Sequence, residues 1–95
     1  MKVQNMTNSN GNKAANQFII ESGCANVYSK MFQSYNSCIV RIDTVNGMEK
    51  IFLDANTWNY SVTTSRYRNQ FLNETTKETQ AKIDSGEYIL TNLNG

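Results

Sequence analysis

The dipeptide Asn46-Gly47 lies between two segments rich in β-branched and other apolar residues, 37–43 and 49–53. Asn-Gly favours a type I′ turn, because both central residues of that turn have positive φ, and Asn and Gly tolerate this region best. The pattern therefore predicts a β-hairpin, with antiparallel strands on either side of a two-residue turn.

Asn, Gly and Ser cluster at three further places in the first half of the chain, at residues 10–11, 22–23 and 35–37. These residue types favour tight turns, so the clusters separate short strands. Strands joined by local turns pair with their sequence neighbours, which predicts an antiparallel β-meander of four to five strands. Residues 1–12 are expected to be either an edge strand of this sheet or poorly ordered.

After residue 54 the spacing of the larger side chains becomes helical. Aromatic and threonine side chains recur every three or four residues, at Tyr60, Thr64, Tyr67 and Phe71. This is the spacing of one face of a helix. Ser61 or Thr63 is expected to cap its start, because either hydroxyl can accept a hydrogen bond from a free backbone N–H two or three residues on.

A second short helix is predicted over residues 76–84. Thr75 and Glu78 have the spacing of a capping box, and Gly86 is placed to adopt the left-handed conformation that ends many helices. The apolar residues 88–90 are expected to return to the sheet as a last strand or an extended tail. The prediction is an α+β fold, a meander with two short C-terminal helices packed on one face, in a single small domain over residues 1–95.

The composition argues against several functional classes. The chain has 95 residues, a net charge of +1 and no His. Because His is the commonest general base and the carboxylates occur singly, we expect no catalytic residue and no enzymatic activity. Two isolated cysteines without His cannot form the usual zinc site, and no Gly-rich phosphate-binding motif occurs. We therefore expect neither a metal nor a cofactor.

No membrane contact is expected, because no apolar run approaches the ~20 residues that a membrane span needs. The start of the sequence has no apolar stretch of the kind found in signal peptides, which predicts a cytoplasmic protein. In that compartment Cys24 and Cys38 are expected to be reduced thiols packed as small apolar groups. A disulfide between them is the alternative.

The segment 58–72 concentrates the residue types found at protein interfaces. It contains the only Trp, two of the five Tyr and two of the three Arg. Trp, Tyr and Arg are enriched among the residues that contribute most to protein–protein binding. We therefore predict a partner-binding surface formed by Trp58, Tyr60, Arg66, Tyr67 and Arg68. The alternative is that Trp58, Tyr67 and Phe71 form the core face of the helix and the arginines are solvated.

Four strings, NGNKAANQFII, FQSYNS, WNYSVTTSRYRNQFL and KETQAKIDSGEY, together resemble a family of small, largely uncharacterised proteins encoded by bacteriophages and other mobile elements of bacteria. The resemblance spans residues 8–94 and supplies no catalytic or binding residues. It implies an accessory protein in the host bacterial cytoplasm, of a kind that often acts against host defence. Such proteins, anti-CRISPR inhibitors among them, are commonly short and act by occupying the surface of a host protein.

These observations predict a non-enzymatic accessory protein that binds a host protein, such as a defence nuclease or its complex, as an inhibitor. The alternative is a small nucleic-acid-binding protein that uses Arg66, Arg68 and Lys13 with stacking by Tyr or Trp, and whose affinity falls steeply with salt. A third expectation is self-association as a homodimer, in which an edge strand at residues 2–6 pairs across the dimer axis.

Overall fold

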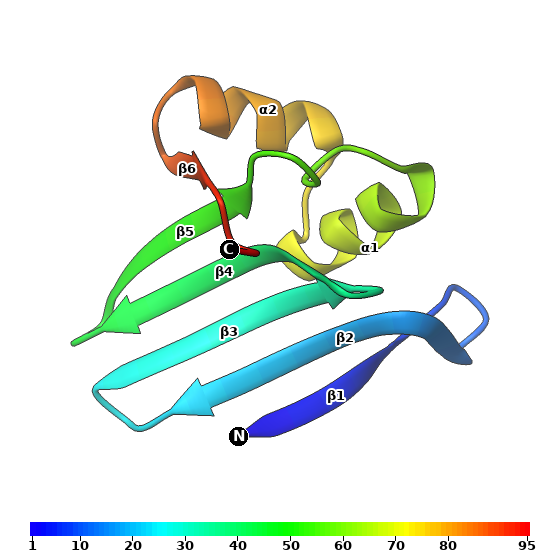
Figure 1. Ribbon diagram of the computed structural model, residues 1–95, viewed down its shortest axis with the longest axis horizontal. Coiled ribbons are helices and arrows are strands. Elements are labelled where there is room, and N and C mark those ends of the chain that lie inside the picture. The colour runs from blue at the N-terminus through cyan, green and yellow to red at the C-terminus, as the bar shows by residue number, and fades with distance from the viewer.

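A computed structural model of the protein describes all 95 residues and contains six strands and two helices (Figure 1). The elements are β1 (Lys2–Thr7), β2 (Lys13–Gly23), β3 (Val27–Ser34), β4 (Ser37–Val45), β5 (Met48–Asp54), α1 (Val62–Leu72), α2 (Thr76–Asp84) and β6 (Tyr88–Thr91). They form one sheet in sequence order, in which β1 to β5 are antiparallel and β6 is parallel to β5. The predicted α+β meander is confirmed, with a sixth strand added at the edge next to β5.

The predicted hairpin at Asn46-Gly47 is confirmed. Asn46 and Gly47 have φ values of 51° and 83°, and Val45 pairs with Met48 across the two-residue turn. Both positive values match the type I′ geometry, whose twist fits the twist of the flanking strands.

A β-bulge in β4 brings two consecutive side chains into the core. Phe32 pairs with Val40, whereas the next residue of β3, Gln33, pairs with Cys38, so Ile39 is the extra residue. Ile39 and Val40 are both fully buried. A regular strand would place one of them on each face, and the bulge removes this alternation locally.

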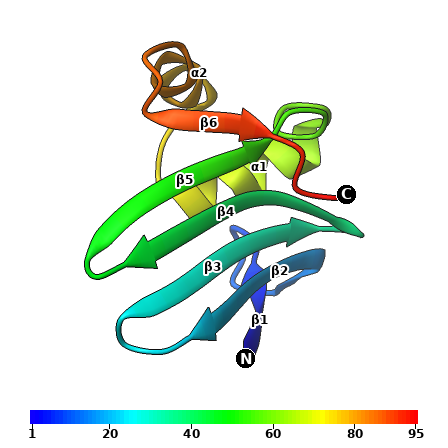
Figure 2. The same cartoon turned by 60° about the vertical axis from the view of Figure 1, so that its left-hand side comes forward.

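One face of the sheet carries the core and α1. In Figure 2 the strands lie in front of α1, and no helix covers the near side of the sheet. On the covered face Phe32 stacks on Phe71 of α1, with ring centroids 5.8 Å apart. The buried hydroxyls of Ser34 and Thr64 are 2.9 Å apart, which fixes the start of α1 to the end of β3.

Both helix starts are capped as the sequence predicts. Ser61 is the N-cap of α1 and accepts a hydrogen bond from the Thr64 backbone N–H. Thr75 and Glu78 form the complete capping box of α2, and these hydrogen bonds lower the pKa of Glu78. Because α1 begins after Ser61, Tyr60 does not belong to the helix, and its predicted place on the helical face is wrong.

The carboxylate of Glu74 joins the linker between the helices to α2 and β6. Its Oε1 accepts hydrogen bonds from the Tyr88 hydroxyl at 2.6 Å and the Thr79 hydroxyl at 3.1 Å, and its Oε2 forms an ion pair with Lys82 at 2.7 Å. Burial and the hydrogen bond to Glu74 raise the pKa of Tyr88 to about 12. The carboxylate is therefore part of the packing around α2, although only Glu78 takes part in the helix cap.

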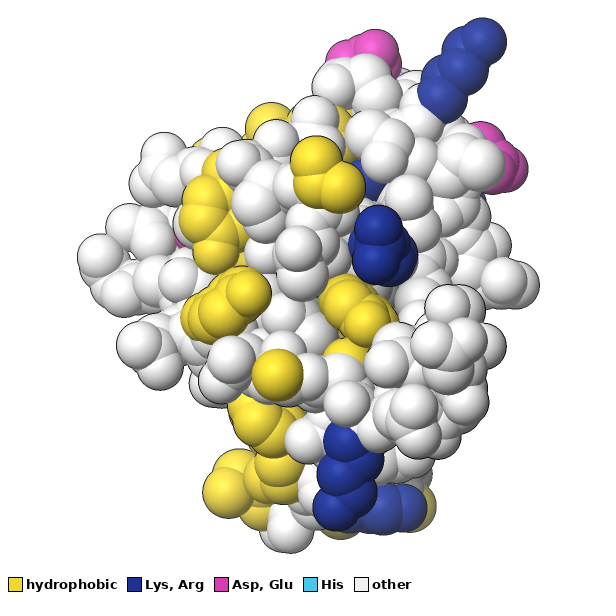
Figure 3. All heavy atoms as spheres, turned by 90° about the vertical axis from the view of Figure 1, so that its right-hand side faces the viewer, with side chains coloured by type: hydrophobic (Ala, Val, Ile, Leu, Met, Phe, Trp, Pro, Cys, Tyr) yellow, Lys and Arg dark blue, Asp and Glu magenta, His cyan; other side chains and the backbone are white.

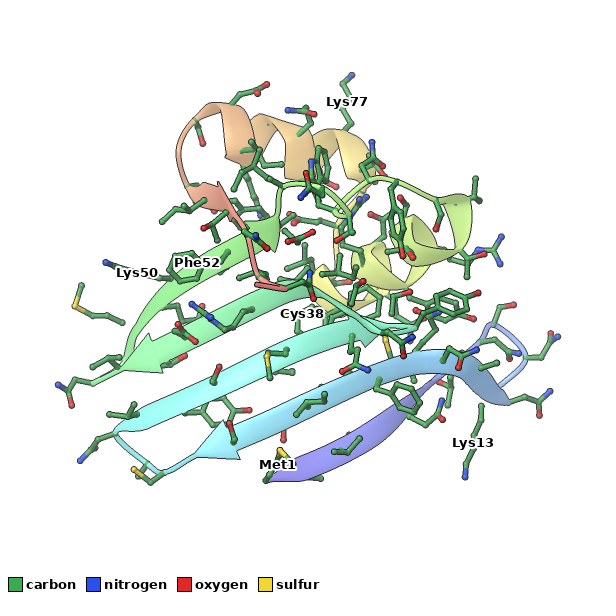
Figure 4. The ribbon with its side chains drawn as sticks, viewed as in Figure 1. Met1, Lys13, Cys38, Lys50, Phe52 and Lys77 are labelled. Atoms are coloured by element: carbon green, nitrogen blue, oxygen red, sulfur yellow. The ribbon has the colours of Figure 1, made fainter.

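The C-terminal residues close one corner of the sheet. The buried carboxylate of Asp54 accepts hydrogen bonds from the Thr57 hydroxyl and the Leu93 backbone N–H. The Asn94 side-chain amide exchanges two hydrogen bonds with the backbone of Cys38, which lies beside the C-terminal tail in Figure 4. Asn94 thus occupies the place of a neighbouring strand beyond the end of β5.

Both cysteines are free thiols, and their environments differ. Cys38 is half-buried, and burial raises the pKa of its thiol to about 11. Cys24 is exposed in the turn between β2 and β3, so the prediction that it packs as a small apolar group is wrong. Neither helix is long and apolar enough to cross a membrane.

Candidate protein-binding site at the start of α1

The structure separates the five predicted binding residues into two groups. Tyr60 is 52% exposed and Arg66 is also exposed, and both lie around the first turns of α1. Trp58 is half-buried against the core, while Tyr67 and Arg68 are 7% and 0% exposed. Of the five residues, only Tyr60 and Arg66 are therefore exposed and free to contact a partner.

Tyr60 and Arg66 line a common hollow of about 680 Å³ on the outer side of α1. Residues 59–62 form one side of it, and Ser65, Arg66 and Asn69 form the other. Val62, the first residue of the helix, is 78% exposed at this hollow. The name α1 site is used below for the surface formed by Tyr60, Val62 and Arg66.

Arg66 also lines a second hollow, of about 510 Å³, on its other side. There the end of β1 and the two residues after it, 7–9, line the hollow together with Tyr67 and Gln70 of α1. Figure 3 views the side of the molecule that carries α1 and the loop after β1, where a few Lys and Arg side chains lie among hydrophobic ones. Neither hollow is lined by an acidic residue, so Arg66 gives this surface a positive charge without a local counter-charge.

The backbone that presents Tyr60 is held by hydrogen bonds from both ends. At one end, the Asp54 carbonyl accepts from the backbone N–H of Trp58 at 3.0 Å. At the other, the Ser65 hydroxyl donates to the Asn59 side chain at 3.0 Å. These contacts connect the segment before α1 to the end of β5 and to the helix itself, so the exposed side chains stand on a defined support.

Arg68 is buried and makes its hydrogen bonds inside the protein, so its predicted place on a binding surface is wrong. Its guanidinium donates to the Trp58 carbonyl, to the Thr76 hydroxyl at 2.7 Å and to the Asn69 side chain at 2.9 Å. It lies 5.1 Å from the centre of the Trp58 ring, close enough for a cation–π interaction. Burial lowers the pKa of the guanidinium, and the negative charge of Glu74 opposes this effect.

Arg68 therefore joins three parts of the chain: the segment before α1, α1 itself and the first residue of α2. The guanidinium suits this position because its planar fork of donors can reach several acceptors at once. Tyr67 and Phe71 belong to the core and its immediate packing, as the alternative interpretation of the aromatic residues proposed.

Comparison with known proteins gives a family without a known activity. Residues 1–87 match the model of a family of unknown function, DUF8033. The chain belongs to this family. No curated protein and no solved structure matches it.

The DUF8033 match includes the whole α1 site and every element except β6. Because the family description names no activity, it assigns no chemistry to these residues. Within this DUF8033 chain, no group of three or more His, Cys, Asp and Glu side chains lies close enough together to hold a metal ion.

Sequence reasoning missed Val62 as a member of the site. The available signal was its position directly after Ser61, the expected N-cap, because a residue in the first turn outside the apolar stripe faces solvent. Asn59 and Ser65 were also missed, since single polar side chains carry no signal of a shared hollow.

Proposed function

We propose that this protein acts without catalysing a reaction, by binding another protein through the α1 site. The proposed setting is a bacteriophage or other mobile element, and the proposed partner is a host protein of a defence system, which the protein inhibits by occupying its surface. The resemblance to small mobile-element proteins supports the setting, and the composition of the site supports the binding of a protein.

The observation that carries the proposal is the exposure of Tyr60, Val62 and Arg66 around one hollow. A Tyr offers a large flat contact with a hydroxyl, Val62 adds apolar area, and Arg66 supplies a planar set of donors. Tyr and Arg are enriched among interface residues whose truncation costs most binding energy. A hollow between them favours a partner that inserts a side chain there.

Nucleic-acid binding is the alternative, and the burial of Arg68 weakens it. Of the basic residues assigned to that function, Arg66 and Lys13 remain exposed. Lys13 projects from the start of β2 at the lower right of Figure 4. Two exposed cations neutralise few phosphates, and affinity for nucleic acid rises with the number of phosphates neutralised.

The test is affinity capture from a lysate of the bacterial host, with and without nuclease, followed by mass spectrometry. Tagged wild-type protein is compared with Arg66→Ala, Tyr60→Ala and the control Lys77→Ala, whose side chain projects from α2 into solvent in Figure 4. We expect one host protein to be captured in stoichiometric amount after nuclease treatment. Each site variant should weaken its binding about fivefold or more, which corresponds to about 1 kcal/mol.

Equal capture by wild type, both site variants and the control would refute the α1 site as the contact surface. Capture of nucleic acid alone, lost on nuclease treatment or at higher salt, would favour the alternative function.

A further inference from the structure

A row of side chains crosses the sheet on the face opposite the helices. Strand register places one residue from each of the six strands directly beside the next, on the same face. In strand order these residues are Val3, Ile20, Met31, Arg41, Phe52 and Ile89. Five of the six are apolar, and this set is called the open-face row below.

The open-face row is not covered by any other element. Val3 and Ile89, at the two ends, are 56% and 42% exposed, and the four residues between them are half-buried. No helix covers this side of the sheet in Figure 2. Antiparallel sheets with one solvated face normally alternate apolar and polar residues, so a row with five apolar members on the solvated face needs a separate explanation.

The single charged member of the row is compatible with close packing. Arg41 lies 5.0 Å from the centre of the Phe52 ring and forms an ion pair with Asp43 at 3.2 Å. Its guanidinium therefore lies over the Phe52 ring and already has a counter-charge. Covering it leaves the charge paired, which is the condition for burying a cation at modest cost.

We propose that this face is the interface of a homodimer, in which a second copy packs its own open-face row against the first. The two copies are related by a twofold axis that runs along the strands between β3 and β4. The interface differs from pairing at the β1 edge and does not depend on the function proposed for the α1 site.

This axis gives complementary contacts along the row. It places Ile20 of one copy opposite Phe52 of the other, and Val3 opposite Ile89, so apolar side chains meet apolar side chains. Met31 of each copy faces Arg41 of the other, and the thioether is a polarizable partner for the arginine's stem and guanidinium.

A neighbouring row of the same face contains two further charged residues, and the same axis keeps their like charges apart. By register this row is Ser22, Ser29, Asp43 and Lys50, from β2 to β5. The axis places Ser29 opposite Asp43 and Ser22 opposite Lys50. Each charge therefore meets a hydroxyl, and no two charges of the same sign face each other.

A dimer that covers the whole face has the size of a specific interface. Six strands about 4.8 Å apart and about seven residues long cover an area of about 29 by 23 Å, or roughly 650 Å² on each copy. Two such faces bury about 1,300 Å², within the range of about 1,200–2,000 Å² for specific interfaces. The helices lie on the outside of such a dimer, so both copies keep the α1 site accessible.

The first experiment measures molar mass by sedimentation equilibrium over a range of protein concentrations. We expect wild type to dimerise, and Ile20→Lys to shift the dimerisation constant at least tenfold toward the monomer. Thr63→Lys is the matched control, because it adds the same charge at an exposed residue of α1 that belongs neither to this face nor to the α1 site. A wild-type protein that is monomeric at all concentrations, or an Ile20→Lys variant that dimerises like wild type, would overturn the proposal.

Val3→Lys provides a second variant in case Ile20→Lys does not fold. Val3 is more than half exposed in one copy, so the lysine is tolerated by the monomer, and circular dichroism checks that the fold is retained. The same shift toward the monomer is expected, and unchanged dimerisation would contradict the proposal.

Crosslinking tests the orientation of the two copies. Ile20→Cys and Phe52→Cys are prepared separately with Cys24 and Cys38 replaced by Ser, and a short bis-maleimide is added to each variant alone and to their mixture. Each chain then has one cysteine, so every crosslink joins two copies. The proposed axis places the same residue of the two copies three strands apart, about 14 Å across the strands, and the linker is chosen shorter than this.

The proposed axis predicts a crosslinked dimer in the mixture and little in either variant alone. Crosslinking of each variant with itself would instead place the axis across the strands and overturn the proposed orientation. A dimer in sedimentation that gives no crosslink in any sample would show that another surface forms it.

Discussion

Replacement of Arg68 by alanine tests whether a buried guanidinium holds the two helices in place. The side chain is fully buried, and its three shortest hydrogen bonds go to neutral oxygens of Trp58, Asn69 and Thr76. Its removal takes the charged donor from these acceptors and leaves the Asn69 and Thr76 side chains only their longer hydrogen bonds to each other, at 3.4–3.5 Å. Because each lost buried hydrogen bond costs about 1 kcal/mol, and more when the donor is charged, we expect Arg68→Ala to lower the free energy of unfolding by about 3 kcal/mol.

Urea unfolding followed by circular dichroism measures this loss. A domain of this size has a slope of roughly 1.2 kcal/mol per molar urea, so the midpoint should fall by about 2.5 M. Arg66→Ala is the matched control on the same helix, because it removes an identical but exposed side chain, and we expect a change within about 0.5 kcal/mol. Arg68→Lys should restore only part of the loss, since one ammonium cannot reproduce the planar fork.

Equal losses in the two alanine variants, or a loss below about 1 kcal/mol in Arg68→Ala, would refute the structural role of Arg68. The first result would mean that the two arginines have similar environments. The second would mean that water replaces the guanidinium at its acceptors.

Three further predictions concern titratable groups and turns. Because the pKa of Tyr88 is raised to about 12, its neutral phenol stabilises the fold below pH ~10, and this contribution should be lost between pH ~10 and about 12. Tyr88→Phe should therefore flatten the alkaline part of a curve of unfolding free energy against pH. Burial raises the pKa of Asp54, but the hydrogen bonds from Thr57 and Leu93 outweigh this effect and lower the pKa overall. The ionised Asp54 therefore stabilises the fold above its unfolded pKa, and this contribution is lost as the pH falls. Asp54→Asn should lower the free energy of unfolding by about 1–2 kcal/mol at neutral pH and flatten the acid part of the stability–pH curve. Gly47 and Gly23 both have positive φ, but a Cβ added at Gly47 contacts no other atom, whereas one added at Gly23 overlaps the Val27 carbonyl. Urea unfolding should therefore show a loss of about 1 kcal/mol in the free energy of unfolding for Gly47→Ala and a clearly larger loss for Gly23→Ala.

Local signals in the sequence predicted most of the secondary structure. The Asn46-Gly47 turn and the Thr75–Glu78 capping box depend on residues next to each other in the chain, and both are confirmed. The bulge at Ile39 was not predictable in this way, because it depends on the pairing of β4 with β3 and on what the core can accommodate. The open-face row was not predictable for the same reason, because the register of strand pairing decides which side chains lie beside one another.

The burial of Glu74 could not be predicted from its neighbours in sequence. The helix dipole stabilises a negative charge just before the first turn of a helix, and this local effect predicts an exposed acidic side chain. Its partners Lys82 and Tyr88 come from α2 and β6, and they meet only when the chain returns to the sheet. Long-range pairs of this kind leave no pattern that one sequence can show.

The contrast between Arg66 and Arg68 explains why the candidate site was predicted only in part. Two residues separated by two positions on a helix differ by about 200° around its axis, so they cannot share a face. The buried stripe of α1 includes Thr64, Tyr67 and Arg68, a polar, an aromatic and a charged residue, and this composition hides the usual apolar periodicity. Once the hydroxyl contact to Ser34 places Thr64 against the sheet, Arg68 follows one turn later on the same side. The geometry then assigns different properties to the two arginines: substitution of Arg66 should change binding and leave the unfolding midpoint in place, whereas substitution of Arg68 should change the midpoint first.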